Sequence, residues 1–205
     1  MTMVEILIAS GITITVMGGI VAVVNPAQAL VRVQGEAADL HQRLRAAADT
    51  LTGDLRGAIA IRPYRVGAIR DDSVAGIYYR PDTIAVLGNT MTTTYYLKTD
   101  ASELMQYDGG VSDLPMVEHV VRLTFDYFGP VSSADQSLVR FDPGILADGP
   151  WSEDASHRLV DTDLLRISEV RIDIRLEATA SSLRRLVPDE EIVLYVALRR
   201  RAHDR

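Results

Sequence analysis

An uncharged, mostly apolar stretch of 19 residues, Ile6 to Val24, constrains the fold of this chain more than any other feature. At ~1.5 Å per residue, it is long enough to cross the ~30 Å hydrocarbon core of a bilayer as one helix. Glu5 comes directly before it and is the only ionisable side chain among the first 31 residues. A carboxylate in a membrane segment costs about 2.5–3.5 kcal/mol. Glu5 therefore predicts a partner that arrives when helices meet inside the bilayer.

Two simpler interpretations of the apolar stretch remain open. A secretory signal peptide would fit Ala27-Gln28-Ala29, which has the small-x-small form of a signal-peptidase site. The length of the stretch, the absence of Lys and Arg before it and the presence of Glu5 count against cleavage. The second alternative is a plain membrane anchor, with Glu5 reaching the lipid headgroups unpaired.

Small residues recur every four positions along the apolar stretch. Gly11, Thr15 and Gly19 would lie on one helix face, where small side chains let membrane helices pack closely. Glycine is common in membrane helices in any case, so a contact face and a chance spacing are both open. Pro26 lacks an amide hydrogen and crowds the preceding turn, so it predicts a break or kink in the helix.

Residues 26–62 show the pattern of an amphipathic helix. Apolar residues separated by three or four positions form one stripe, at Leu30, Val33, Ala37, Leu40, Leu44, Ala47, Leu51, Leu55 and Ala58. The spacing is close to a heptad repeat, so a coiled-coil dimer is an alternative to packing on a core. A sheet that needs a cover follows, which favours the core. Arg62-Pro63 predicts the end of this helix, and residues 1–60 as one kinked helix would be ~90 Å long.

Residues 63–205 carry the signature of an antiparallel β-rich domain. Short apolar segments are separated by turn sequences, and strands are expected at 77–79, 84–87, 94–97, 104–107 and 192–198. Two longer segments alternate cleanly, with one face formed by Val121, Leu123, Phe125 and Tyr127 and another by Val170, Ile172, Ile174 and Leu176. The sequence therefore predicts an α+β fold. A long kinked N-terminal helix, transmembrane over residues 1–25, packs on an antiparallel β-sheet.

The stretch 129–165 is the least regular part of the domain. Gly129-Pro130 and further Pro-Gly turn sequences predict a long surface loop with one short strand near Val139. The only tryptophan, Trp151, is a candidate contact residue at an interface. The alternative is that Trp151 pins its own loop to the core.

Composition and motifs argue against most chemistry. The net charge is −7, and most of it lies after residue 60, which disfavours nucleic acid and tight docking on anionic lipids. The chain has no cysteine, and it lacks phosphate-binding, zinc-protease, nucleophile-elbow and calcium-loop motifs. The four histidines are scattered. The acidic residues of 142–163 have the oxygen ligands for Ca²⁺, but their spacing matches no Ca²⁺ loop that we recognise, so a solvated acidic loop is favoured over a Ca²⁺ site. We expect no catalytic residue, no cofactor and no metal.

The first nine residues, Met1-Thr2-Met3-Val4-Glu5-Ile6-Leu7-Ile8-Ala9, resemble the start of mature type IV pilins and pseudopilins. In that family a prepilin peptidase removes a basic leader, and the new N-terminal residue, usually Phe and sometimes Met, is N-methylated. The resemblance implies that Met1 is the methylated residue; an initiator methionine is the alternative. It also implies that Glu5 pairs with the N-terminus of a neighbouring subunit. At ~4 Å and an effective dielectric near 20, this attraction is about 4 kcal/mol, comparable with the insertion cost.

The same resemblance gives the small residues and the proline a second role. Gly18, Gly19 and Pro26 would let the helix loosen as it leaves the membrane for a filament. The later segments are similar in order to two large minor subunits, the J-type minor pseudopilin of type II secretion and the W-type minor pilin of type IV pili. This looser similarity rests on Asp54-Leu55-Arg56, Tyr107-Asp108-Gly109, 117–127, 165–176 and the last strand ending Ala197-Leu198-Arg199. Relatives often end in Arg-Asn, whereas this chain has Arg199-Arg200-Arg201.

The resemblance implies a non-enzymatic structural subunit, minor and located at the filament tip, of a type IV pilus-like filament or a type II secretion pseudopilus. Its expected partners are other pilin or pseudopilin subunits, the prepilin peptidase and the inner membrane. The chain would cross the inner membrane once, with its C-terminal domain in the periplasm, before it enters the filament. The alternatives are a major subunit of such a filament and a membrane-tethered periplasmic binding or enzymatic domain.

Overall fold

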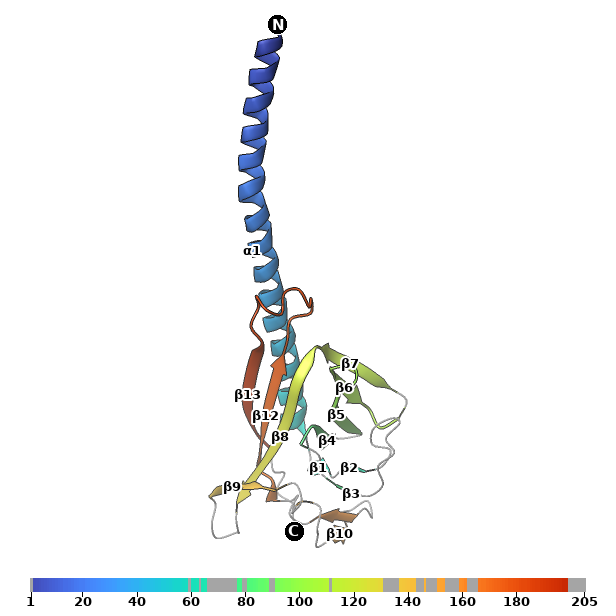
Figure 1. The fold of residues 1–205 in the computed structure, drawn as a ribbon. Coiled ribbons are helices and arrows are strands. Elements are labelled where there is room, and N and C mark those ends of the chain that lie inside the picture. Colours follow the sequence, from blue (N-terminus) through green and yellow to red (C-terminus); the bar gives the residue numbers. More distant parts are fainter. Residues whose placement is uncertain are drawn as a thin grey trace.

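The computed structural model describes residues 2–58, 60–62, 64–65, 77–78, 81–88, 91–110, 112–130, 137–142, 146, 151–153, 159–161 and 166–198, with only the backbone at 62, 64–65, 77–78, 151–153 and 159–161. One long helix precedes a series of strands (Figure 1). The elements are α1 (Met3–Gly57), β1 (Ala60–Arg62), β2 (Tyr64–Arg65), β3 (Ile77–Tyr78), β4 (Thr83–Leu87), β5 (Thr92–Lys98), β6 (Glu103–Tyr107), β7 (Asp113–Glu118), β8 (Val120–Pro130), β9 (Leu138–Phe141), β10 (Trp151–Glu153), β11 (Leu159–Asp161), β12 (Glu169–Leu176) and β13 (Glu190–Ala197). Every strand pair among these elements is antiparallel. The predicted α+β layout is confirmed.

The helix ends earlier than the sequence pattern predicts. It stops at Gly57, and Ala58 has an extended backbone whose N–H donates to the carbonyl of Leu55 at 3.2 Å. Residues 60–62, expected in the helix, instead form β1 and pair with β4. The helix boundary at residue 62 is therefore wrong. Gly57 favours helix least of the residues nearby, and the pairing with β4 takes over the backbone hydrogen bonds beyond it.

The lower half of α1 packs on the core through the predicted apolar stripe. From Leu40 onward, its members are at most 6% exposed, namely Leu40, Leu44, Ala47, Leu51, Leu55 and Ala58. The upper end of the stripe is not covered, because Leu30 is 59% exposed and Val33 and Ala37 are only partly buried. Packing on the sheet is thus confirmed for the last five turns of the helix, and Leu30 belongs to the bare part.

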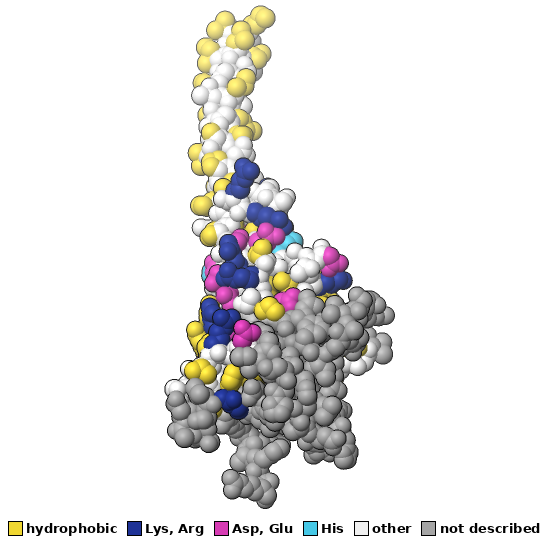
Figure 2. Space-filling view, turned by 60° about the horizontal axis from the view of Figure 1, so that its bottom comes forward, with side chains coloured by type: hydrophobic (Ala, Val, Ile, Leu, Met, Phe, Trp, Pro, Cys, Tyr) yellow, Lys and Arg dark blue, Asp and Glu magenta, His cyan; other side chains and the backbone are white. Residues whose placement is uncertain are grey.

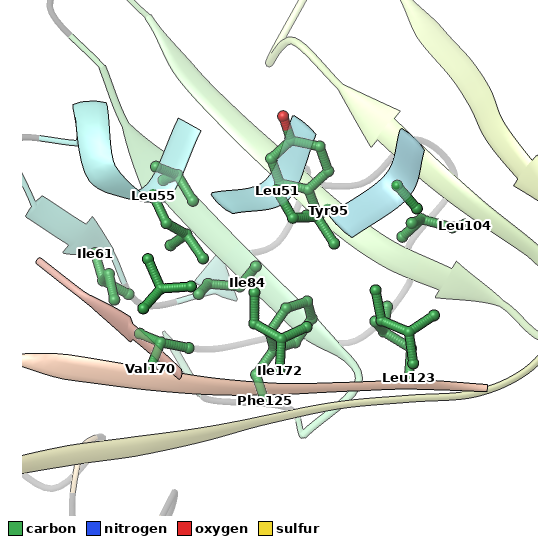
Figure 3. Packing of buried hydrophobic residues seen from close by; sticks show 14 of the residues in the cluster. Leu51, Leu55, Ile61, Ile84, Tyr95, Leu104, Leu123, Phe125, Val170 and Ile172 are labelled. Atoms are coloured by element: carbon green, nitrogen blue, oxygen red, sulfur yellow. The ribbon is translucent and has the colours of Figure 1, made fainter. Parts of the chain in front are cut away.

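Two antiparallel sheets, rather than the single predicted one, lie beside α1. The first has the strand order β1-β4-β5-β6-β7 and the second the order β13-β12-β8-β9. The helix contacts β13 and β12 of the second sheet and β7 of the first. Figure 3 shows side chains of α1 and of both sheets meeting in one core, including Leu51, Tyr95 and Ile172.

The central strand β12 alternates as predicted, whereas β8 departs from the pattern at one residue. Val170, Ile172, Ile174 and Leu176 are all fully buried. In β8 the pairing with β12 shifts, so that Arg175 lies opposite Arg122 and Leu176 lies opposite Val120. Val121 is the extra residue of this β-bulge and is 51% exposed, so its predicted place in the core is wrong.

The predicted loop 129–165 contains more structure than its sequence indicates. Gly129 and Pro130 belong to β8 and pair with Val139 and Leu138 of β9, which confirms the strand near Val139. Later in the stretch, β10 and β11 form an antiparallel hairpin that the sequence pattern did not predict. The start of the loop at residue 129 is therefore wrong by two residues.

A hydrogen-bond network joins the end of α1 to the first sheet. The hydroxyl of the fully buried Tyr95 donates to the carboxylate of Asp54 and accepts from Nε2 of Gln106 at 3.1 Å. Burial, and secondarily the hydrogen bond to Asp54, raises the pKa of Tyr95 far above its ordinary value. The lower half of the helix is thus fixed to the sheet by polar contacts as well as by packing.

Candidate membrane and assembly segment

The first half of α1 projects from the domain without cover. Its most apolar 18-residue window contains no buried residue, and α1 is long and apolar enough to cross a membrane. Large apolar side chains along it range in exposure from 40% at Val24 to 82% at Met3. Figure 2 shows hydrophobic side chains along the visible face of the projecting rod. Such a surface is unfavourable in water and is satisfied by lipid or by other apolar helices.

Glu5 has a partner within its own helix. Thr2 is the N-cap residue, and its Oγ1 accepts a hydrogen bond from the backbone N–H of Glu5 at 3.4 Å. In return, Oε2 of Glu5 accepts one from the backbone N–H of Thr2 at 2.7 Å. This is a capping box, in which the carboxylate also lies at the positive end of the helix dipole. Glu5 thus has a hydrogen-bond partner within its own chain, and its pairing with a neighbouring subunit stays a prediction.

The capping box leaves part of the carboxylate available. Oε1 of Glu5 accepts no hydrogen bond from the part of the chain that the structure describes, and no ion pair to Glu5 occurs there. An ionised carboxylate can accept several hydrogen bonds. A cation brought by a second molecule could therefore bind Glu5 without breaking the box. The Thr-x-x-Glu spacing that builds the box is legible in the sequence.

The small-residue stripe faces open space. A Cβ atom built on Gly11, Gly18 or Gly19 would meet no atom within 4 Å. The hydroxyl of Thr15 donates to the carbonyl of Gly11 at 2.8 Å, so it is satisfied within the helix. Thr13 does the same with Ala9. Hydroxyls satisfied in this way carry little penalty in hydrocarbon. The stripe has the room that a closely packed second helix needs.

Pro26 lies inside a continuous helix. The helix runs from Met3 to Gly57 through this residue, so of the predicted break or kink the break is wrong. Figure 1 shows a gently bent rod, as expected for a helix that continues past one internal proline. One backbone hydrogen bond is lost at Pro26, and the turns on both sides keep theirs. The bare and buried halves are therefore parts of one rod.

Several residues singled out in the sequence lie outside the described part of the chain, among them Met1 and the basic run Arg199-Arg200-Arg201. The side chains of the acidic residues from 148 to 163 lie outside it as well. Of Trp151 only the backbone is described, in β10 opposite Asp161. Among the described residues, no group of three or more His, Asp or Glu could hold a metal ion.

The two histidines within the described range have structural surroundings. Nε2 of His41 on α1 lies 3.3 Å from Oε1 of Glu190, at the start of β13. His119 adopts φ 60° in the tight connection between β7 and β8, and its carbonyl accepts from the N–H of Glu177 at 3.0 Å. His41 thus forms a contact between α1 and β13, and His119 forms part of the connection between β7 and β8.

Comparison of the chain with protein-family models, with curated proteins and with solved structures finds no match. The arrangement itself indicates two capabilities. The bare half of α1 can be buried in lipid or among other helices, and Glu5 can bind a cation at the very start of that segment.

Proposed function

We propose that this chain is a structural subunit of a type IV pilin-like filament. The bare half of α1 is held in the membrane before assembly and is buried among equivalent helices afterwards, with the β domain outside. One observation carries the proposal: a single uninterrupted helix is bare and apolar over one half, with a carboxylate at its start, and forms the domain core over the other. The resemblance of residues 1–9 to mature pilins supports it.

Within that class we favour a minor, tip-located subunit of a pilus or of a type II secretion pseudopilus. The chain crosses the inner membrane once, its β domain lies in the periplasm, and its partners are other pilin or pseudopilin subunits. Met1 is the residue methylated after cleavage by the prepilin peptidase. The looser similarity to J-type and W-type subunits and the long stretch 129–165 support a minor role.

Glu5 provides the assembly contact. Oε1 of Glu5 accepts a hydrogen bond from the charged α-amino group of a neighbouring subunit, while Oε2 stays in the capping box. The attraction of about 4 kcal/mol at ~4 Å offsets the cost of about 2.5–3.5 kcal/mol for the carboxylate in the membrane. Only the charge is needed for this contact, whereas the box needs only an acceptor oxygen.

That difference gives a sharp experiment. Glu5→Gln keeps an acceptor for the capping box but removes the charge, because Gln also serves at this position of the box. Thr2→Ala removes the hydroxyl of the box and keeps the charge. We expect Glu5→Gln to remain in the membrane fraction and to be lost from sheared filaments. Thr2→Ala should enter the filaments, as detected by immunoblotting of both fractions.

The matched variants also define the refutation. Normal incorporation of Glu5→Gln would refute the charge-based contact. Equal loss of Glu5→Gln and Thr2→Ala would show that helix capping, and not pairing with a neighbour, governs assembly. If neither variant were found in the membrane fraction, misfolding would be the explanation. Limited proteolysis is the control, because a folded variant gives the same cleavage pattern as the wild type.

The capping box favours one rival function. Because Glu5 already has a local role, α1 could be a plain tether for a periplasmic binding domain. Intact-mass measurement of the N-terminus separates the two. A methylated Met1 supports the filament subunit, whereas an unmodified or formylated initiator supports the tether.

A further inference from the structure

The connection between β12 and β13 forms a compact turn against α1, where the helix leaves the domain (Figure 1). The backbone N–H of Thr179 donates to the carboxylate of Glu36 on the helix. Ala178 and Val187 are buried, at 0% and 1% exposure. The N–H of Val187 donates to the carbonyl of Leu183 at 2.8 Å, which closes the turn. The turn is thus held at a fixed position along the rod.

The exposed side of this turn carries a basic and an apolar side chain next to each other, among polar residues. Arg185 is exposed and forms no ion pair with any described residue, and Leu186 is 62% exposed. Arg184 is held by Glu177 at 2.9 Å. On the helix, Arg32 is exposed and likewise has no ion-pair partner in the described part of the chain. Figure 2 shows several Lys and Arg side chains where the apolar rod meets the domain, with Asp and Glu side chains between them.

The spacing along α1 places this surface at the edge of a bilayer. Glu5 and Arg32, the first two charged residues, are 27 positions apart. At ~1.5 Å per residue they are separated by about 40 Å, close to the ~40–45 Å thickness of a bilayer with its headgroups. Glu36, which holds the turn, lies only about 6 Å further along the helix. A helix that spans the membrane between its first two charges therefore brings the turn to the headgroup layer.

We propose that Arg32, Arg185 and Leu186 form a collar that binds the lipid headgroups of the membrane crossed by α1. The arginines bind headgroup phosphates, and Leu186 enters the interfacial layer, the combination used by membrane-surface segments. Continuity with the spanning segment and the local positive charge favour lipid as the occupant. The net charge of −7 disfavours docking of the domain as a whole, but the collar is a local exception. The collar rests on the membrane-held state in the proposed function and is independent of filament assembly.

The absence of cysteine allows a site-specific test in the full chain. Leu186→Cys carries an environment-sensitive fluorophore, and the full chain is reconstituted in vesicles of phosphatidylethanolamine with a minor fraction of phosphatidylglycerol. Leu138→Cys is the matched control, because Leu138 is 50% exposed on β9, at the opposite end of the domain (Figure 1). We expect nitroxides on the headgroups to quench the label at 186 and not the label at 138.

Charge variants test the role of the arginines. Each basic residue near an anionic surface contributes about a fivefold preference for that surface. Arg185→Gln should therefore lower about fivefold the ratio of quenched to unquenched label at 186. Added salt should lower it too. Arg45→Gln is the control, because Arg45 is also exposed but lies further along α1, away from the bare half. Quenching at 186 that ignores both Arg185→Gln and salt would overturn the proposal.

Two further results would overturn the collar in distinguishable ways. If the chain floats with the vesicles but the label at 186 is as free of quenching as the label at 138, the collar is wrong and the proposed function stands. If the label at 186 is buried only in assembled filaments, the collar is also wrong and the proposed function stands, because the surface would then be a contact between subunits. If the chain does not float with the vesicles, the collar and the membrane-held state fall together.

Discussion

Gly129 is the position where one added methyl group should cost the fold most. A Cβ atom there would lie 2.2 Å from the carbonyl oxygen of Arg166 and 2.6 Å from Cε2 of Phe141. The chain at 166–168 crosses β8 this closely because the N–H of Ser168 donates to the carbonyl of Phe128 at 2.8 Å. Nη2 of Arg166 also donates to the carbonyl of Pro130, at 2.9 Å. The opposing atom is backbone on a hydrogen-bonded segment, so it cannot move aside cheaply.

The expected effect of Gly129→Ala follows from this contact. Overpacking a well-packed core costs about 1–3 kcal/mol, and a clash with backbone belongs at the upper end. In a chain of this size, each kcal/mol lowers the Tm by about 2–4 °C, so we expect a decrease of about 6–12 °C. Thermal unfolding of the full chain in detergent, followed by circular dichroism, measures it.

The matched control is Gly53→Ala in α1. A Cβ at Gly53 would meet no atom within 4 Å, and the residue is exposed within the helix. The same substitution there should raise the stability by about 0.4–1 kcal/mol, because alanine is the better helix former. A Tm of Gly129→Ala within about 2 °C of the parent would refute the close approach of 166–168 to β8.

Two other predictions follow from the sheets. Leu123→Ala should lower the stability by about 2–5 kcal/mol and Val121→Ala by less than about 0.5 kcal/mol, since only Leu123 is buried; equal shifts in the urea midpoint would contradict the β-bulge. Burial raises the pKa of both Tyr95 and Tyr127 above the ordinary value near 10, so the folded state retains protons that the unfolded state releases. This contribution to stability is complete below pH ~10 and is lost as the pH rises further; a urea midpoint unchanged between about pH 9 and 11 would contradict it.

The parts of the fold that the sequence predicts are those in which one face of an element is buried along its length. The step of three and four from Leu40 to Leu55 and the step of two in β12 both record contact with the same core. Such periodicity is a local property of the sequence, so it can be recognised without knowing which element packs against it. The same pattern extends up to Leu30, however, and there the domain no longer reaches the helix. Periodicity shows which face is apolar and not how far the cover extends.

The errors arise where a distant segment decides the outcome. Val121 is in step with the apolar alternation of β8, so the sequence pattern places it on the buried face. Only the register with β12 reveals the bulge. Gly129 resembles a turn residue, yet its lack of a side chain serves the crossing of 166–168. The stop at Gly57 likewise depends on the pairing of β1 with β4.

For the candidate site, the bare apolar helix and the prominence of Glu5 could be predicted, and the capping box could have been. The box is a four-residue spacing that needs no tertiary information. The turn at 177–189 could not be placed beside α1 from the sequence, because the contact between Glu36 and Thr179 joins residues 143 positions apart.

The continuity of α1 through Pro26 links the bare apolar half of the helix to the domain mechanically. Residues 40–55 are locked into the core, and the turn held by Glu36 clasps the helix just above them. The bare half therefore cannot rotate or slide relative to the β domain without breaking that packing. In the proposed filament, a contact at Glu5 would therefore also set the distance and orientation of the domain, along a rod of about 80 Å. Assembly through the first turn of the helix would thus position the outer domain without a separate interface.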